Sequence, residues 1–431
     1  MPVAAVPEYL GRDFSEASPG LRFGLYLPLW TERADQERQV RALAGKRSRE
    51  AGELKEILDS KGMDAAIEHA RARRGRLPAL WEKNDHGARD AWRTVARLTP
   101  DDVARGHALQ ERQSAMIELL ESAGQAAVFH ARSVAPFTTG LGNEHPLENG
   151  FAFLWPYGLP YLPGSGVKGV LRQAARELAG ISTAAQWELE SDWTAEAIDA
   201  LFGSEDSAAP ARGALQFWDV IPGIRGDSLM LEVMTAHQSH YYQKGESPHE
   251  SGRPNPINYL TVPPGSAFAF HVVCNLSFLR GRAPELAENG RWKALLEQAF
   301  AHAFDWLGFG AKTAVGYGAM AVDERAVEAA EQRRREREEE ARVAAMTEEE
   351  RQIDELRSLF ERECAAGRLA PNGLIAEKRL RLLKAARGWT DPGARRAAGA
   401  LLREIARELP WSKKRVREAR AIMAELLGGC E

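Results

Sequence analysis

The stretch YLPGSGVKGVLR, residues 161–172, decides between two very different folds. Its three glycines, Gly164, Gly166 and Gly169, fit the G-x-G-x-x-G pattern of a dinucleotide-binding loop. A helix-like run opens directly after them, and an acidic residue follows at about the distance that such a loop requires. The pattern by itself is compatible with a nucleotide cofactor, with another phosphate-bearing ligand, or with no ligand.

The sequence that precedes these glycines excludes the dinucleotide fold. A dinucleotide loop follows a buried strand rich in β-branched residues, whereas the residues here read WPYGLPYLP. Pro156, Pro160 and Pro163 are incompatible with a central strand, because proline cannot donate to the hydrogen-bond ladder. The Walker pattern G-x-x-x-x-G-K-[ST] is also missing from the chain. A nucleotide-binding enzyme is therefore a disfavoured alternative, because the buried strand that should precede such a loop is missing.

The residues after the glycines predict an amphipathic helix that ends near Gly180. Its apolar face consists of Val167, Leu171, Ala174 and Leu178. A second row, spaced by four residues, consists of Lys168, Arg172 and Arg176. Cations in the first turns of a helix oppose its dipole. Either the row is simply solvated, or an external anion such as phosphate binds both the cations and the nearby N–H groups.

A second glycine-rich segment, WLGFGAKTAVGYGAM at 306–320, raises the same question. It contains Gly308, Gly310, Gly316 and Gly318 around Lys312 and Thr313. Lysine, hydroxyl, aromatic side chains and flexible backbone suit a polyanion with stackable bases. The alternative is a helix C-cap followed by a tight turn into a last strand. Two such segments in one region, without a nucleotide-hydrolysis motif, favour contact with RNA backbone.

Strand and helix patterns alternate without the rhythm of a large parallel sheet, which predicts an α+β fold. The clearest strand is 265–278, where Phe268, Phe270, Val272, Cys274, Leu276 and Phe278 are predicted to share one face. Further strands are predicted over 22–30, 213–221 and 229–235, and further helix over 291–308.

Changes in composition divide the chain of 431 residues into four parts. We expect an N-terminal segment with the first core strand (1–30), a helical insertion (31–128), a core (129–323) and a helical extension (324–431). Within the extension, mixed-sign charges at 331–360 predict one long solvated helix. Further helical segments are predicted from there to the end, with breaks near Pro371, Pro392 and Pro410.

The overall composition is that of an ordinary soluble protein, at 44% hydrophobic and 27% charged residues. We expect a cytoplasmic location and no membrane partner, because neither a signal peptide nor a bilayer-length apolar run occurs. The three cysteines lie far apart, which favours neither a disulfide framework nor a metal site, and no cofactor is expected. Net charge is −4, so any contact with nucleic acid has to be local, at the basic clusters 71–76, 168–176 or 411–420.

Three motifs together resemble the RAMP superfamily of CRISPR effector proteins, and within it the family of the sixth subunit of type III-B Cmr complexes. The first is G-x-x-x-x-H-P-x-E, with Gly140, His145, Pro146 and Glu148. The second is YGLPYLPGS-x-x-KG-x-LR, and the third is the glycine-rich segment at 308–318. The similarity covers roughly residues 129–323 and FGLYL near the start. The insertion at 31–128 and the extension after 324 depart from the family pattern.

The resemblance implies an RRM-like (ferredoxin-type) core and a structural role in an RNA-targeting antiviral ribonucleoprotein. It implies binding to the 3′ portion of the guide RNA near the end of the subunit stack, next to other RAMP subunits, with the target single-stranded RNA met only indirectly. The residues expected to contact RNA are Ser165, Lys168, Gly169, Arg172, Arg176, Gly308, Gly310, Lys312 and Thr313.

Catalysis is the alternative, because some RAMP proteins are metal-independent ribonucleases that process guides. Such cleavage needs a group that activates the 2′-hydroxyl and another that protonates the leaving oxygen. The plausible groups are His145, His237, His240, Tyr241 and Tyr242. A metal site at His237 and His240, with His249 as third ligand, is disfavoured, because a strand entering a loop would point these histidines to opposite faces. Asp13 and Glu16 are not assigned, and His145 with Glu148 is expected to order a loop, so we expect no enzyme activity.

Overall fold

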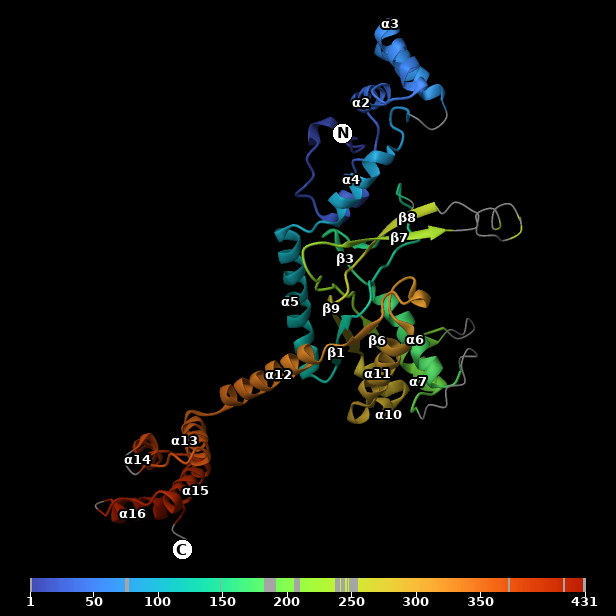
Figure 1. Ribbon diagram of the computed structural model, residues 1–431. Helices are drawn as coiled ribbons and strands as arrows, with labels where there is room; N and C mark the ends of the chain where they lie inside the picture. Colours follow the sequence, from blue (N-terminus) through green and yellow to red (C-terminus); the bar gives the residue numbers. More distant parts are fainter. Residues whose placement is uncertain are drawn as a thin grey trace. The chain divides into compact units, whose positions relative to one another are not determined.

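The computed structural model describes residues 2–73, 77–147, 149–181, 191–204, 210–236, 241, 245, 247, 255–370, 373–413 and 415–428 (Figure 1). The chain forms two compact units, Met1–Val327 and Glu328–Glu431. None of the helices in these described ranges is long and apolar enough to cross a membrane.

Unit 1 is built on a four-stranded antiparallel sheet with the strand order β10-β1-β9-β6. The strands are β1 (Ala126–Ser133), β6 (Leu215–Phe217), β9 (Ala267–Cys274) and β10 (Met320–Val322). Helix α6 (Gly164–Leu178) lies in the chain between β1 and β6, and α11 (Arg291–His302) lies between β9 and β10. The sheet strands and these two helices therefore follow one another as β-α-β-β-α-β. The predicted α+β class is confirmed.

The core lies between this sheet and the two helices. Phe268, Phe270, Val272 and Cys274 of β9 are all buried, as their alternation predicts. From α11, Phe300 stacks on Phe129 of β1 with ring centroids 4.1 Å apart. The apolar row predicted on α6 is buried at Val167, Leu171 and Ala174. The prediction that Leu276 and Phe278 continue the strand face is wrong, because Asn275 accepts a hydrogen bond from the Phe278 backbone and begins helix α9 (Leu276–Arg282).

The opposite face of the sheet contains a buried histidine, His271 of β9. Its ring centroid lies 5.8 Å from that of Trp218, and its Nδ1 has no hydrogen-bond partner among the described residues. Burial, together with the neighbouring His130, lowers the pKa of His271 to about 4. The folded protein therefore holds this imidazole in its neutral form.

We expect the free energy of unfolding to fall as the pH is lowered from about 6.5 to about 4, because the unfolded histidine binds a proton that the folded one excludes. The loss amounts to about 3 kcal/mol once the pH is below the folded pKa. Urea unfolding measured in steps across this range checks the prediction. His271→Leu should lose much less stability over the same interval, and an equal loss in both proteins would contradict the assignment.

The N-terminal part of unit 1 is helical in its described residues. The helices are α1 (Pro19–Gly24), α2 (Arg33–Ala44), α3 (Arg49–Ala72), α4 (Asp85–Ala96) and α5 (Pro100–Ser122). The short strand predicted over 22–30 is wrong, since α1 occupies its first residues. Pro19 at the first helical position favours this helix, and the helix places Arg22 against Asp102 of α5. The local sequence pattern around Arg22 does not predict that contact.

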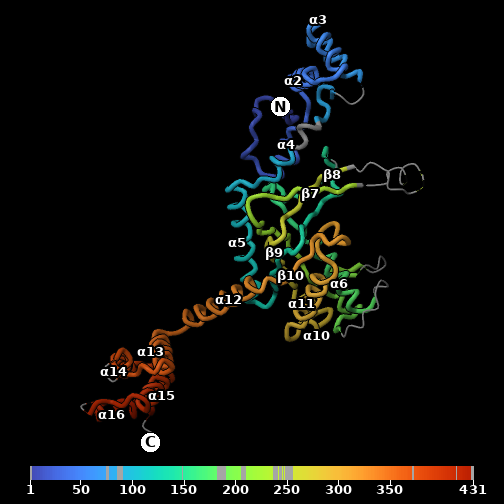
Figure 2. The backbone as a smooth tube through the Cα atoms, viewed as in Figure 1, coloured from blue at the N-terminus to red at the C-terminus, as the bar shows by residue number. Residues whose placement is uncertain are grey.

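The remaining elements of unit 1 are short, apart from one long hairpin. The hairpins are β2 (Phe153–Leu154) with β3 (Leu159–Pro160), β4 (Gly203–Ser204) with β5 (Ala211–Arg212), and β7 (Met230–Ala236) with β8 (Asn255–Thr261). The helices are α7 (Ala195–Phe202) and α10 (Pro284–Ala287), with short helical turns η1 (Glu8–Leu10), η2 (Glu288–Gly290), η3 (Ala303–Leu307) and η4 (Thr313–Val315). Figure 2 shows β7 and β8 extending beyond the four-stranded sheet.

Unit 2 is helical and has a hydrophobic core of its own. Its helices are α12 (Glu324–Ala345, which begins in unit 1), α13 (Glu348–Ala365), α14 (Leu374–Ala386), α15 (Pro392–Glu408) and α16 (Val416–Leu426). The core includes Leu356, Phe360, Leu382, Leu402 and Ile422.

The single long helix predicted over 331–360 is interrupted in unit 2. Thr347 caps α13, and its side chain accepts from Glu350 N while the Glu350 side chain accepts from Thr347 N. Pro392 opens α15 and Pro410 follows its C-cap, in line with the predicted breaks, whereas Pro371 lies outside the described residues.

Candidate nucleic-acid interface

The first glycine-rich stretch is the beginning of helix α6 and not a loop ahead of it. The helix starts at Gly164, so GSGVKG forms its first turns. A Cβ on Gly164 would lie 2.2 Å from the Phe217 carbonyl oxygen, which explains the glycine by close backbone approach. The Gly164 N–H donates to Asp219 Oδ1 at 2.8 Å. Asp219 therefore accepts the hydrogen bond of one of the N-terminal amides that, in the anion hypothesis, would donate to a phosphate.

Five candidate residues lie on one face of α6, since each is three or four positions from at least one other: Ser165, Lys168, Gly169, Arg172 and Arg176. Their environments differ. Ser165 and Gly169 are exposed, and a Cβ on Gly169 would meet no atom within 4 Å. Lys168 is half-buried, whereas Arg172 donates through Nη2 to the Gly203 carbonyl at 2.8 Å. Arg172 is therefore tied to the protein, and the open part of this face is its N-terminal part.

The second glycine-rich segment is a closed turn between η3 and β10. Gly308 has a left-handed backbone (φ +67°) and ends η3 as its C-cap. The buried Phe309 donates its N–H to the Gly318 carbonyl at 2.9 Å, and the Gly318 N–H donates to the Pro136 carbonyl at 2.8 Å. The predicted alternative of a C-cap and tight turn is thus confirmed for the backbone.

Residues 310–313 form the outer side of this turn. Gly310 is exposed, yet a Cβ there would lie 2.3 Å from the Thr138 carbonyl oxygen, so the backbone runs close to residues 137–138. The Lys312 backbone is left-handed (φ +62°), and Thr313, which is half-buried, begins η4.

The Lys312 side chain joins the turn to the β7–β8 hairpin. Its Nζ lies 3.6 Å from the Met234 sulfur and 5.4 Å from the centre of the Tyr259 ring. The Tyr259 hydroxyl donates to the Tyr317 hydroxyl at 2.7 Å, and burial raises the pKa of Tyr259. The sequence does not predict this tyrosine pair, because 58 positions separate the two residues.

The catalytic candidates give no acid/base pair among the described residues. His145 Nε2 lies 2.9 Å from the Phe23 carbonyl oxygen, its Nδ1 accepts from Leu147 N at 3.1 Å, and its ring stacks on Phe23. Burial lowers the pKa of His145, which keeps it neutral. These contacts order the 143–147 segment. Glu148, His237, His240, Tyr242 and His249 lie outside the described residues, and Tyr241 is exposed.

Asp13 and Glu16, the acidic candidates near the N-terminus, are both exposed. Asp13 accepts from Ser15 N at 3.0 Å at an exposed position, which is a local turn. Among the described residues, no group of three or more histidine, cysteine or acidic side chains could hold a metal ion. Cys274 is buried in the sheet and Cys364 is exposed, whereas Cys430 lies outside the described residues.

Both glycine-rich segments fall inside the part of the chain that matches a known family. Residues 130–321 match the RAMP superfamily. This part of the chain is therefore similar to the RAMP superfamily, in agreement with the resemblance of its motifs.

Within that superfamily the chain resembles Cmr6 of the type III-B Cmr complex. The CRISPR system Cmr subunit Cmr6 of Pyrococcus furiosus is 28% identical over 235 residues, which cover 42% of this chain and 63% of that protein. The chain thus matches less than two thirds of that relative's length. The crystal structure of Cmr6 from Pyrococcus furiosus is similar at 26% identity and a TM-score of 0.28, covering 46% of this chain and 97% of that one. A cryo-EM structure of the type III-B Cmr-beta bound to cognate target RNA contains a chain at 17% identity and a TM-score of 0.41, with 67% and 87% covered.

Proposed function

We propose that this protein is a guide-RNA-binding, non-catalytic subunit of a type III-B CRISPR effector complex. It holds the 3′ portion of the guide near the end of the subunit stack, contacts other RAMP subunits and meets the target RNA only through the guide. The observation that carries the proposal is the RAMP match over 130–321, which contains both glycine-rich segments. The resemblance to Cmr6 supports the type of complex.

The proposal assigns an RRM-like, ferredoxin-type core to residues 129–323. The β-α-β-β-α-β order and the sheet order β10-β1-β9-β6 support this core. In this proposal residues 31–128 are a helical insertion, residues 324–431 are a helical extension, and the complex acts in the cytoplasm.

The guide backbone contacts the N-terminal face of α6 and the outer side of the 308–318 turn. Exposed Ser165 and Gly169 let a phosphate approach the helix backbone, and Lys168 supplies a cation beside them. On the turn, Gly310 leaves the backbone accessible next to Lys312 and Thr313. Gly308 supports the turn from its buried position, and Arg172 and Arg176 continue the cationic row.

Lys168→Glu is expected to weaken guide RNA binding without unfolding the protein, because Lys168 is half-buried on the open part of α6. Each phosphate contact that is lost should reduce the slope of log Kd against log salt by about 0.7 for a single strand. Lys312→Glu should act in the same direction. Filter binding or fluorescence anisotropy over a series of salt concentrations measures both affinity and slope.

The matched control for these variants is Lys61→Glu, the same charge change at an exposed position of α3, outside the RAMP match. It should leave the slope nearly unchanged. If Lys168→Glu changes affinity and slope no more than Lys61→Glu, α6 does not contact the guide.

The assembly is tested by affinity purification of the tagged protein from its native host, with sequencing of bound RNA. We expect guide-length RNAs with a common repeat-derived end, together with other RAMP subunits. A lone protein without RNA would contradict the proposal.

Incubation of the purified protein with repeat RNA in EDTA tests the non-catalytic role, and cleavage that His237→Ala or His240→Ala abolishes would establish the ribonuclease alternative instead.

A further inference from the structure

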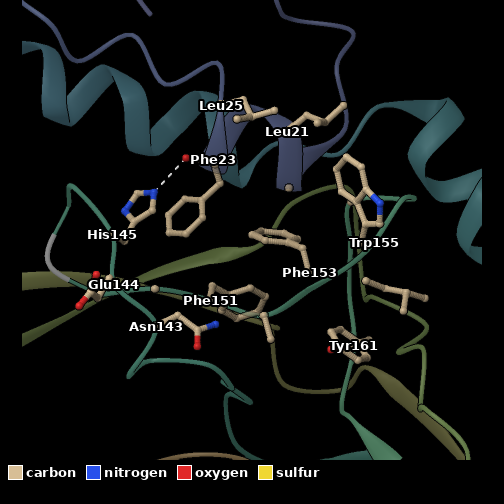
Figure 3. A pocket seen from close by; sticks show the side chains of 16 residues that line it. Leu21, Phe23, Leu25, Asn143, Glu144, His145, Phe151, Phe153, Trp155 and Tyr161 are labelled. Atoms are coloured by element: carbon tan, nitrogen blue, oxygen red, sulfur yellow. Dashed lines mark hydrogen bonds between the residues drawn. The ribbon is translucent and has the colours of Figure 1, made fainter. Parts of the chain in front are cut away.

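An aromatic pocket of about 540 Å³ opens in unit 1 between α1, the 143–153 segment and the β2–β3 hairpin (Figure 3). This volume lies within the range of small-molecule sites, ~300–1,000 Å³. Figure 3 shows Asn143, Glu144 and His145 on one side and Trp155 and Tyr161 on the other, with the rings of Phe151 and Phe153 between them.

The phenylalanines form a firm wall for this pocket. Phe23 stacks on His145 with ring centroids 3.7 Å apart, and Phe153 tilts against both Phe23 and Phe151. Phe23 and Phe151 are buried and Phe153 is half-buried, so these rings are fixed by the core. A planar ligand therefore meets a preformed aromatic wall, with little ordering required on binding.

Trp155 differs from these rings because it remains available. It is 75% exposed, and it makes no ring contact or hydrogen bond with another described residue. A large indole beside an open pocket is an apolar surface that a ligand can cover. Tyr161 lines the same side and is half-buried.

The polar groups of the pocket suit the edge of a neutral, planar ligand. The Asn143 side chain is exposed and offers both a donor and an acceptor, as a base edge requires. Among the described residues that line the pocket there is no lysine or arginine, and the one carboxylate is that of Glu144, which lies at the side with its oxygens turned away from the rings (Figure 3). The described lining therefore offers no cation to a phosphate, which favours insertion of the uncharged base of a nucleic acid.

The pocket shares chain segments with both parts of the candidate interface. Tyr161 lies three residues before Gly164, where α6 begins. Ala152 in the lining donates its N–H to the Thr139 carbonyl at 3.0 Å, and the adjacent Thr138 carbonyl accepts from Ala311 N at 2.8 Å. The pocket wall is thus continuous with α6 on one side and with the 308–318 turn on the other.

We propose that this pocket binds a single unstacked nucleobase of an RNA strand, which inserts between Trp155 and the phenylalanine wall with its polar edge toward Asn143. The identification of RNA as the source of the base rests on the proposed function. Aromatic platforms next to a backbone-binding surface are the arrangement by which proteins hold single strands without strict sequence preference.

The pocket is tested in the full-length protein with nucleosides, which carry a base but no phosphate. Saturation-transfer NMR with adenosine and with uridine gives a dissociation constant for each. We expect binding by the wild type, a Kd at least about five-fold higher for Trp155→Ala, and substantial recovery in Trp155→Phe. Trp306→Ala, an exposed tryptophan of η3 outside the pocket, should change the Kd less than about two-fold.

Three results would overturn the inference. They are failure of the wild type to bind either nucleoside, an equal Kd in Trp155→Ala and the wild type, and displacement of the nucleosides by N-acetyl-arginine amide at lower concentration. The last result would identify the pocket as a site for a cationic side chain of a partner protein. Nucleoside binding in a protein that does not retain guide RNA would support the pocket and contradict the proposed function, so the two can fail separately.

Discussion

Gly318→Ala will lose on the order of 4 kcal/mol of unfolding free energy, or will fail to fold. Gly318 has a left-handed backbone (φ +69°), and a Cβ there would lie 1.8 Å from the Phe309 carbonyl oxygen. The clash can be relieved only by moving the 308–318 turn. That movement breaks the hydrogen bonds from Phe309 N to Gly318 O and from Gly318 N to Pro136 O. It also displaces Phe309, which is fully buried against Phe270.

The control for this prediction is Gly316→Ala in the same turn. Gly316 also has a left-handed backbone (φ +92°), but no atom lies within 4 Å of its Cβ position. It therefore measures the backbone strain alone, about 1 kcal/mol. Urea unfolding of both variants separates the two contributions. Equal urea midpoints for Gly318→Ala and Gly316→Ala would contradict the prediction, because they would mean that the turn can move without destabilising the core.

Arg22→Met is expected to lose about 3–5 kcal/mol of unfolding free energy. The Arg22 and Asp102 side chains are each 1% exposed, and their charged groups lie 3.6 Å apart. The guanidinium also donates to the Thr94 and Arg97 carbonyls, which joins α1 to the end of α4 and to the segment between α4 and α5. Methionine keeps the packing of the side-chain stem but removes the buried cation from Asp102, whose remaining cationic contact among the described residues is with the more exposed Arg105.

Arg105→Met is the matched control, because Arg105 contacts the same carboxylate from an exposed position. Its Nη1 lies 3.4 Å from Asp102 Oδ1, and its side chain is 45% exposed. An exposed pair of this kind contributes at most about 1 kcal/mol. Denaturant unfolding at low and moderate salt should show a large, nearly salt-independent loss for Arg22→Met and a small loss for Arg105→Met. Similar losses in the two variants would show that burial does not determine the strength of this pair.

The sequence predicted those elements in which local pattern and tertiary environment agree. The alternation in 267–274 predicts a half-buried strand because one face of β9 meets α11 and the other does not. The apolar row of α6 is predictable for the same reason, since Val167 and Leu171 repeat at the helical period on the side that is buried. The match of residues 130–321 to the RAMP superfamily was predictable as well, because its motifs are continuous in the chain.

Contacts between distant residues decided the rest. The helix over 19–24 is stabilised by the contact between Arg22 and Asp102, which lies 80 positions away in the chain. The local sequence pattern does not predict such a contact. The glycine pattern that begins at Gly164 is compatible with a phosphate-binding loop, but Gly164 is required because the Phe217 backbone crosses the start of α6. The aromatic pocket could not be predicted either, because its residues come from three segments that only the folded chain brings together.

By itself, then, the sequence determined the α+β class, the helix and strand faces of the core, and the similarity to the RAMP superfamily, because each depends on residues that are close in the chain. The tertiary structure alone decided why the glycines are needed, which cations are tied to the protein, and where rings gather around an open pocket. Those features depend on close approach between backbones and on burial, which are set only when distant segments pack.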